Sequence, residues 1–149
     1  SSHIAHDCNI GNNVIIANNV PLGGHVTIED NVVIGGNSAV QQFTRIGKLA
    51  MIGGMTGVLN DVIPFGLSIG NRNYLQGLNL IGLRRRSDYD NKDILGLIEA
   101  YKEIFLTENL NENLSKLNGA FKENPLVKEV INFITKDKKR SICTPFSKE

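Results

Sequence analysis

The sequence predicts an all-β solenoid, a parallel β-helix of hexapeptide repeats, followed by a small helical domain. A branched aliphatic residue recurs at every sixth position from Ile4 to Val58. A second register of the same period, from Cys8 to Val62, holds only small or β-branched residues. Beyond Pro64 the apolar spacing changes to the three- and four-residue steps of amphipathic helices. A six-residue period sustained this long is typical of a parallel β-helix, because neither helical spacing nor simple alternation keeps its phase over such a distance.

The repeat region covers residues 1–64, and each hexad is expected to form one short strand and one corner. Three hexads close a triangular coil, in which the aliphatic side chain points inward and stacks on its counterpart in the next coil. Corners need left-handed backbone conformations, which glycine and asparagine adopt at low cost. The chain begins inside a hexad, so we expect a fragment of a longer protein. The corner asparagines are Asn12, Asn13, Asn18, Asn19, Asn31 and Asn37.

A connection over residues 65–87 leads to a helical domain over residues 88–149. The first helix is expected to start near Asp88 or Asn91 and to run to about Phe105. A second apolar stripe lies between 110 and 121, and Pro125 opens a third helix because proline suits the first helical turn. The charged tail that follows residue 135 is expected to be solvated and frayed.

Composition excludes several classes of protein. The net charge is +1 with 21% charged residues, so the chain lacks the basic excess that nucleic-acid binding requires. Hydrophobic residues make up 41% and are too dispersed for stable membrane insertion. The two cysteines, Cys8 and Cys143, lie far apart and indicate no disulfide framework. We therefore expect a cytoplasmic protein.

All three histidines, His3, His6 and His25, lie in the first 25 residues. His25 follows His6 by nineteen residues, about one coil, so the two imidazoles are expected to lie near each other outside the core. A neutral imidazole can take a proton from an alcohol, and Asp7 could orient the ring. Gly24 could leave a backbone N–H open to an acyl oxygen. The alternatives are three unrelated surface histidines, and corner positions for Asp7 and Gly24.

The run Arg84-Arg85-Arg86 has two interpretations. Guanidinium groups supply paired donors to phosphates, which would make the run part of a phosphate-binding site. A solvated run of charges before a helix is the alternative.

Four segments match the pattern of a known family: His3-Ile4-Ala5-His6-Asp7-Cys8, Leu22-Gly23-Gly24-His25-Val26, Ile52-Gly53-Gly54, and Gly77-Leu78-Asn79 with Gly82-Leu83-Arg84-Arg85-Arg86. Together they resemble the UDP-N-acetylglucosamine 3-O-acyltransferase family, and the resemblance covers most of the chain. It implies a homotrimer of left-handed β-helices with active sites between subunits. It also implies transfer of an (R)-3-hydroxyacyl chain from acyl carrier protein to the 3-hydroxyl of UDP-N-acetylglucosamine in lipid A biosynthesis, with no cofactor and no metal.

The resemblance also implies a role for each matching residue. His6 resembles the general base, Asp7 its partner, and Gly24 the oxyanion donor. Gly54 lies where the family sets acyl-chain length, since a larger side chain would shorten the acyl groove. The residues implied in binding the UDP-sugar are His3, His25, Gln42, Asn79, Arg85 and Arg86.

Three positions depart from the family pattern, and each affects a contact. Gln41 stands where several members have histidine, Ile81 where some have glutamate, and Arg72 where some have histidine. Members also have further N-terminal coils with an acidic sugar-binding residue. This fragment is therefore expected to fold without catalysing acyl transfer by itself. Acyl-chain length is left open.

Three other functions fit the same pattern. A related sugar N-acyltransferase shares the prism and a base histidine, although Asn79 and the arginines favour the O-acyltransferase. A zinc hydratase is conceivable because three neutral histidines can hold Zn²⁺. An inactive trimeric β-helix is the non-catalytic alternative.

Overall fold

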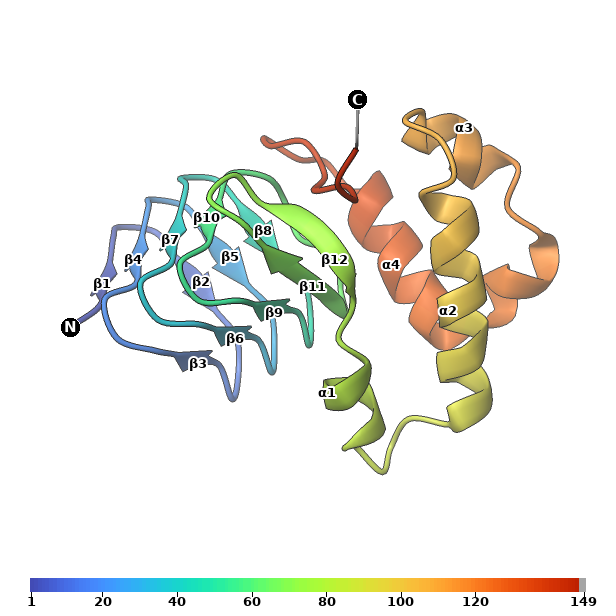
Figure 1. Cartoon of the computed structure of the whole chain (residues 1–149), viewed down its shortest axis with the longest axis horizontal. Helices are drawn as coiled ribbons and strands as arrows, with labels where there is room; N and C mark the ends of the chain where they lie inside the picture. Colours follow the sequence, from blue (N-terminus) through green and yellow to red (C-terminus); the bar gives the residue numbers. More distant parts are fainter. Residues whose placement is uncertain (148–149) are drawn as a thin grey trace. The chain divides into compact units, whose positions relative to one another are not determined.

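Ten two-residue strands follow one another at six-residue spacing in the first part of the chain (Figure 1). The computed structural model describes residues 1–147, and the strands occupy the positions that the hexad pattern predicts. They are β1 (His3–Ile4), β2 (Asn9–Ile10), β3 (Ile15–Ile16), β4 (Pro21–Leu22), β5 (Thr27–Ile28), β6 (Val33–Ile34), β7 (Ala39–Val40), β8 (Arg45–Ile46), β9 (Met51–Ile52) and β10 (Gly57–Val58).

Every third strand pairs in parallel, which builds the three faces of a prism. Two sheets have the strand orders β1-β4-β7-β10 and β2-β5-β8. The third has the order β12-β11-β9-β6-β3, in which β11 (Gly66–Ile69) and β12 (Tyr74–Leu78) follow the repeats. Ile4 is in register with Leu22, so one coil takes eighteen residues, or three hexads. The predicted fold class, a left-handed parallel β-helix of hexapeptide repeats with a small helical domain, is confirmed.

The inward aliphatic residues form the core of the prism. They are fully buried where a coil lies on each side, as at Leu22, Ile28 and Ile34, each no more than 1% exposed. Ile4 in the first coil is 50% exposed, because a neighbouring coil covers it on one side only. The small residues of the second register, such as Ser38 and Thr44, are also buried.

The corners repeat one strained backbone conformation. Every sixth residue from Asp7 to Met55 has a positive φ between 56° and 64°. Asparagine and aspartate tolerate this left-handed region because their short polar side chains bond locally, whereas larger side chains adopt it at a cost. The nine residues are Asp7, Asn13, Asn19, His25, Asn31, Asn37, Phe43, Leu49 and Met55.

A hairpin and the C-terminal segment complete this part of the molecule. Strands β11 (Gly66–Ile69) and β12 (Tyr74–Leu78) pair antiparallel, and β11 continues the sheet next to β9. The backbone N–H of Asp61 donates to Ser141, and its buried carboxylate accepts a 2.9 Å bond from Arg45 Nε. Burial raises the pKa of Asp61, and the bonds from Arg45 oppose that rise. Burial likewise raises the pKa of the Cys143 thiol to about 11.

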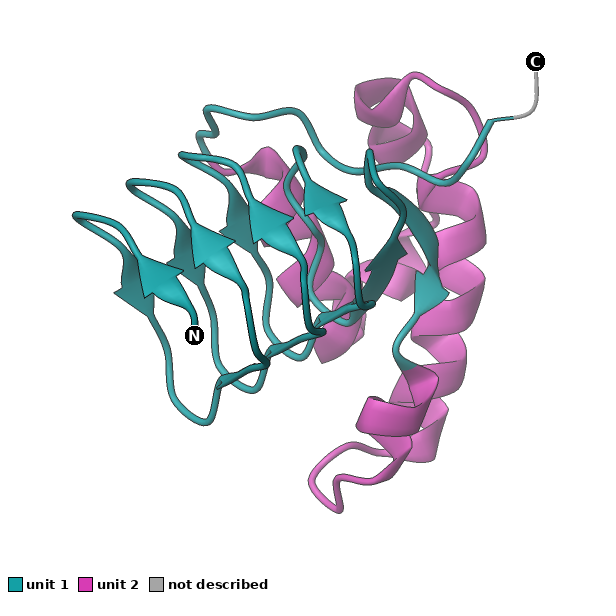
Figure 2. Ribbon diagram, turned by 60° about the vertical axis from the view of Figure 1, so that its left-hand side comes forward, with its two compact units in different colours: residues 1–79, 137–149 teal, residues 80–136 magenta. Residues whose placement is uncertain are grey.

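The helices form a second compact unit over residues 80–136 (Figure 2). Four side-chain caps, Asp90, Asn109, Asn118 and Asn124, each accept a backbone N–H at the start of a helix. The helices are α1 (Leu80–Arg84), α2 (Asn91–Ile104), α3 (Leu110–Ser115), the 3₁₀ helix η1 (Gly119–Glu123) and α4 (Pro125–Thr135).

The bounds of the two units differ from the ranges that the sequence suggested. Among the described residues the first unit comprises 1–79 and 137–147, so the predicted connection over 65–87 is divided between the units. The expectation of a frayed tail is wrong for its described part, because Arg140 Nε donates to the Gln42 carbonyl and Cys143 N donates to Asp61. Of the helices within residues 1–147, none has the length and apolar character needed to cross a membrane.

Candidate active site

The candidate catalytic residues His6, Asp7, Gly24 and His25 lie along one edge of the prism. This edge, which we call the catalytic edge, consists of the corners after β1, β4 and β7. Backbone hydrogen bonds join the successive corners, from His25 N to His6 O at 3.1 Å and from Phe43 N to Gly24 O at 2.9 Å. Residues eighteen positions apart are therefore stacked, which brings His6 next to Gly24 and Asp7 next to His25.

The carboxylate of Asp7 lies between two imidazoles. Its Oδ2 is 3.1 Å from Nδ1 of His6 and 3.8 Å from Nε2 of His25. The two imidazole rings meet edge to face, with centroids 5.1 Å apart. All three side chains are exposed to solvent. The expected grouping of His6, Asp7 and His25 is thus present, and Asp7 can orient the imidazole of His6 and support its protonated form.

Phe43 belongs to the same edge and was not singled out from the sequence. Its ring stacks on His25 with a centroid distance of 4.8 Å and an interplanar angle of 4°. This contact covers one face of the His25 ring, while the ring edge that bears Nε2 still faces Asp7. The eighteen-residue spacing of Asp7, His25 and Phe43 was the signal that could have identified it.

Gly24 offers both space and a hydrogen-bond donor beside His6. A Cβ on Gly24 would lie 2.9 Å from Cε1 and Nε2 of His6, so the close approach of the imidazole requires glycine. No residue of the described part of the chain accepts a hydrogen bond from the Gly24 N–H. At the equivalent corner positions Asn12 and Lys48, this N–H donates to a carboxylate oxygen of Asp30 or Glu29. The corner geometry therefore directs an N–H outward to a place where an anionic oxygen fits.

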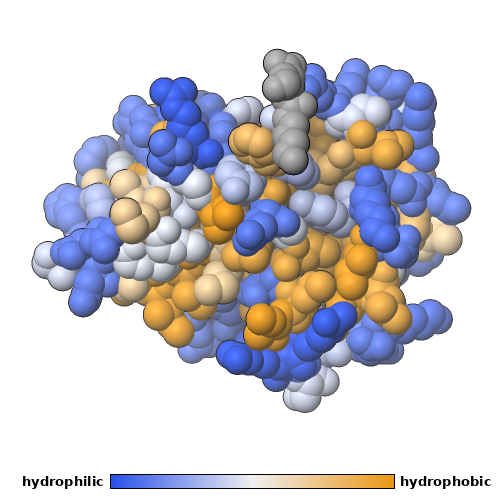
Figure 3. Space-filling view, viewed as in Figure 1, coloured by the Kyte–Doolittle hydropathy of each residue, from blue (hydrophilic) through white to orange (hydrophobic). Residues whose placement is uncertain are grey.

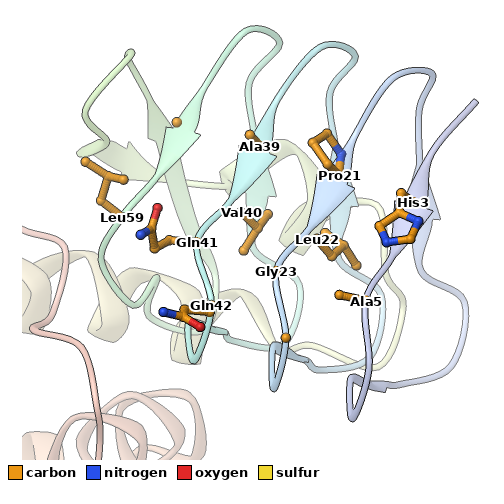
Figure 4. Close-up of a pocket in the computed structure, with 12 residues that line it drawn as sticks. His3, Ala5, Pro21, Leu22, Gly23, Ala39, Val40, Gln41, Gln42 and Leu59 are labelled. Carbon is orange, nitrogen blue, oxygen red and sulfur yellow. The ribbon is translucent and has the colours of Figure 1, made fainter.

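A shallow groove of about 500 Å³ runs along the β1-β4-β7-β10 sheet beside these corners. His3, Gly24 and Gln42 line it, and so does Gln41. Figure 4 shows His3 and Leu59 at opposite ends, with strands β4 and β7 between them.

Gly54 lies on a different edge of the prism, at the corner after β9. It is exposed, and a Cβ there would meet only the backbone of Gly36, no closer than 3.4 Å. Apolar side chains gather over the neighbouring strands β3 and β6 in the space-filling view (Figure 3). Ile15 and Met51 on this face are 60% and 39% exposed.

The residues expected to bind the nucleotide are divided between the two units. Asn79 closes the first unit, where its amide Nδ2 donates to the Leu49 carbonyl at 2.9 Å. Arg85 and Arg86 follow α1 in the second unit, Arg85 exposed and Arg86 half-buried. Nε of Arg86 lies 3.4 Å from Oδ1 of Asp88.

Comparison with known proteins relates the chain to one family. The model of the family described as UDP N-acetylglucosamine O-acyltransferase, domain 2, matches residues 61–143. The acyl-[acyl-carrier-protein]–UDP-N-acetylglucosamine O-acyltransferase of Rhizobium etli is 44% identical over 146 residues, which span 97% of this chain and 53% of the relative. The protein of that name from Sinorhizobium fredii is 43% identical, with the same coverage. The chain thus spans about half the length of the curated relatives it matches.

Solved structures agree with this relationship. The UDP-N-acetylglucosamine acyltransferase of Arabidopsis superposes with a TM-score of 0.89 at 38% identity, over 95% of this chain and 52% of that protein. The enzyme of that name from Campylobacter jejuni superposes with a TM-score of 0.84, also at 38% identity, over 97% of this chain and 56% of that protein. The similarity therefore covers both the β-helix and the helices that follow it.

Proposed function

Since the chain belongs to the UDP-N-acetylglucosamine O-acyltransferase family, we propose that its catalytic edge transfers an acyl chain to a sugar hydroxyl. The acyl donor is a thioester on acyl carrier protein, with an (R)-3-hydroxyacyl chain, and the acceptor is the 3-hydroxyl of UDP-N-acetylglucosamine in lipid A biosynthesis. The observation that carries the proposal is the carboxylate-linked pair of imidazoles beside an open backbone N–H.

His6 is the general base of this reaction. Asp7 accepts a hydrogen bond from the Nδ1–H of the ring, and this tautomer leaves the lone pair on Nε2 for the proton of the sugar hydroxyl. As Nε2 takes that proton, the hydroxyl oxygen attacks the thioester carbonyl and a C–O bond forms. The C–S bond then breaks, and the imidazolium returns the proton to the departing thiolate.

Gly24 stabilises the charge that develops on the acyl oxygen. Its N–H is unoccupied among the described residues, whereas the matching N–H groups of Asn12 and Lys48 bind carboxylates. An oxyanion resembles a carboxylate oxygen in its charge and in its hydrogen-bonding needs, so the same corner geometry suits both.

The remaining residues bind the substrates. His3 and Gln42 contact the UDP-sugar along the groove, and His25 contacts it from the corner that follows β4. Asn79, Arg85 and Arg86 contact the nucleotide. Gly54 leaves room for a long acyl chain, because a larger side chain there would project from an exposed corner.

We further propose that the protein is a homotrimer that shares its active sites between subunits. The exposed apolar face around Ile15 and Met51 supports this, because such a face is better buried against a second copy. Light scattering at micromolar concentration should report a trimer, and a stable monomer would contradict the assembly.

Replacement of His6 tests the proposed function. In the protein encoded by the full reading frame, His6→Ala should lower turnover by ~10²–10⁴-fold, the usual contribution of a general base. Affinity for UDP-N-acetylglucosamine, measured by calorimetry on the same preparations, should change far less, because the base acts in the transition state. Turnover close to wild type would reject the assignment. A product that resists alkaline hydroxylamine, which cleaves oxygen esters, would be an amide and would indicate the sugar N-acyltransferase instead.

A further inference from the structure

The side chains of His6, Asp7 and His25 also have the geometry of a metal site. Their ligand atoms all lie within 4.8 Å of one another. Oδ2 of Asp7 is 3.1 Å from the nearer nitrogen of His6 and 3.8 Å from that of His25. Tetrahedral zinc, with bonds of about 2.0–2.2 Å, separates its ligand atoms by roughly 3.4 Å. Small side-chain rotations therefore suffice to bring all three ligand atoms into one coordination shell.

The ligand types select the class of metal. Two imidazoles and one carboxylate suit Zn²⁺ and its neighbours among the transition metals, whereas Mg²⁺ and Ca²⁺ prefer oxygen ligands throughout. Three protein ligands leave at least one coordination position open, and all three side chains face solvent, so an ion can reach the site.

The backbone holds this site ready for an ion. Asp7 and His25 occupy successive corners with the same φ of 58°, and His25 N donates to the His6 carbonyl at 3.1 Å. The stacked ring of Phe43 holds one face of His25. Binding an ion therefore requires little ordering of the chain, which favours affinity.

We propose that His6, Asp7 and His25 form an inhibitory binding site for Zn²⁺. Zinc competes for the atoms that the catalytic hydrogen bond uses, Nδ1 of His6 and Oδ2 of Asp7. When zinc holds Nδ1, the single proton of the neutral ring lies on Nε2, so the ring has no lone pair left to accept a proton. The metal site stands on geometry alone, whereas its inhibitory effect rests on the proposed function.

Calorimetric titration of the chelator-treated protein with Zn²⁺ tests the site. We expect one ion per chain in the wild type, and binding weakened at least about 10-fold in both His25→Gln and Asp7→Asn, because each removes a ligand. His3→Gln is the matched control, since it removes an exposed imidazole outside the cluster and should bind zinc as the wild type does. Nitrogen NMR of the imidazoles should show zinc-dependent shifts at His6 and His25.

Two outcomes would overturn the zinc site. Unchanged zinc affinity in His25→Gln, or an equal loss in His3→Gln, would indicate scattered surface binding.

The acyltransferase assay tests the inhibitory effect separately. Zinc should inhibit at the concentrations that fill the site, and EDTA should restore turnover. Full activity with the site filled would overturn the inhibitory effect. If the protein encoded by the full reading frame is inactive but binds one zinc at this cluster, that result contradicts the proposed function and supports the metal site.

Discussion

Two edges of the β-helix have the same backbone and different side chains. The catalytic edge carries Asp7, His25 and Phe43 at its left-handed positions, with φ of 58°, 58° and 64°. The neighbouring edge, which we call the asparagine edge, has φ of 60°, 61° and 59° at its corresponding positions. The residues there are Asn19, Asn37 and Met55.

The difference shows that the solenoid supplies positions and that the side chains supply function. On the asparagine edge, Asn19 Nδ2 donates to Asn37 Oδ1 at 3.2 Å, so the side chains serve the corner itself. On the catalytic edge, His25 and Phe43 hold a conformation that costs roughly 1–2 kcal/mol outside glycine, asparagine and aspartate. Met55 on the asparagine edge holds the same conformation, with φ of 59°, so backbone strain alone does not distinguish the two edges.

The largest expected contrast between the edges comes from their glycines. Gly24 and Gly36 occupy equivalent corner positions, but an added Cβ would lie 2.9 Å from the His6 ring at Gly24 and 3.6 Å from the nearest atom at Gly36. Gly24→Ala keeps the backbone N–H but must displace the base, so it should lower turnover by roughly 10²–10³-fold, within the range for losing a general base. The assay compares initial rates for both variants.

Gly36→Ala is the matched control for that substitution. Gly36→Ala should keep the thermal midpoint of the wild type, since its Cβ meets only ordinary contacts. Its turnover should be at least about ten times that of Gly24→Ala. Equal losses of turnover in the two variants would mean that the catalytic edge has no special need for glycine.

Asp7→Asn gives the catalytic edge the residue type of the asparagine edge. Asparagine tolerates the left-handed conformation, so the free energy of unfolding should stay close to wild type. Turnover should fall by about 10–100-fold, less than in His6→Ala, because an orienting partner is lost while the base remains. An unchanged turnover, with folding verified by circular dichroism, would assign Asp7 to the corner alone.

The sequence predicted the β-helix because its aliphatic period reports burial directly. It also predicted that His6 and His25 lie near each other, since nineteen residues is close to one coil. It left the direction of Asp7 open, because neighbours on a strand point apart. The positive φ of Asp7 turns its carboxylate back toward His6, and this conformation belongs to the corner and not to the strand.

Long-range pairings were beyond the reach of the pattern. The hairpin of β11 and β12 extends a sheet of the β-helix, but its sequence does not follow the hexad pattern. The antiparallel pairing of its two strands depends on the turn near Gly70. The described part of the charged tail returns to the prism through backbone bonds to Asp61 and Leu75, and backbone bonds leave no trace in side-chain composition. The stack of Phe43 on His25 was detectable in principle, from spacing alone.

Phe43→Asn separates support of His25 from support of the fold. An asparagine relieves the left-handed strain of a bulky residue, so the thermal midpoint should stay level or rise. Loss of the ring stack, worth about 0.5–1.5 kcal/mol, should weaken binding of the UDP-sugar by roughly 2–10-fold, with a smaller effect on turnover. Calorimetry measures the affinity, and unchanged affinity would leave Phe43 without a role in placing His25.

The smallest expected effect on catalysis comes from the asparagine edge itself. Asn37→Ala removes the 3.2 Å bond from Asn19 and places alanine in a left-handed conformation, so the free energy of unfolding should fall by about 1–2 kcal/mol. His25 already carries this backbone penalty, so His25→Ala should change the free energy of unfolding less than Asn37→Ala does. Only His25→Ala should weaken binding of the UDP-sugar, because only that side chain reaches the candidate site. Denaturant unfolding measures the stability of both variants, and calorimetry measures their affinity for the UDP-sugar. An equal loss of affinity in the two would show that a change in the corner backbone, and not loss of the imidazole, weakens binding.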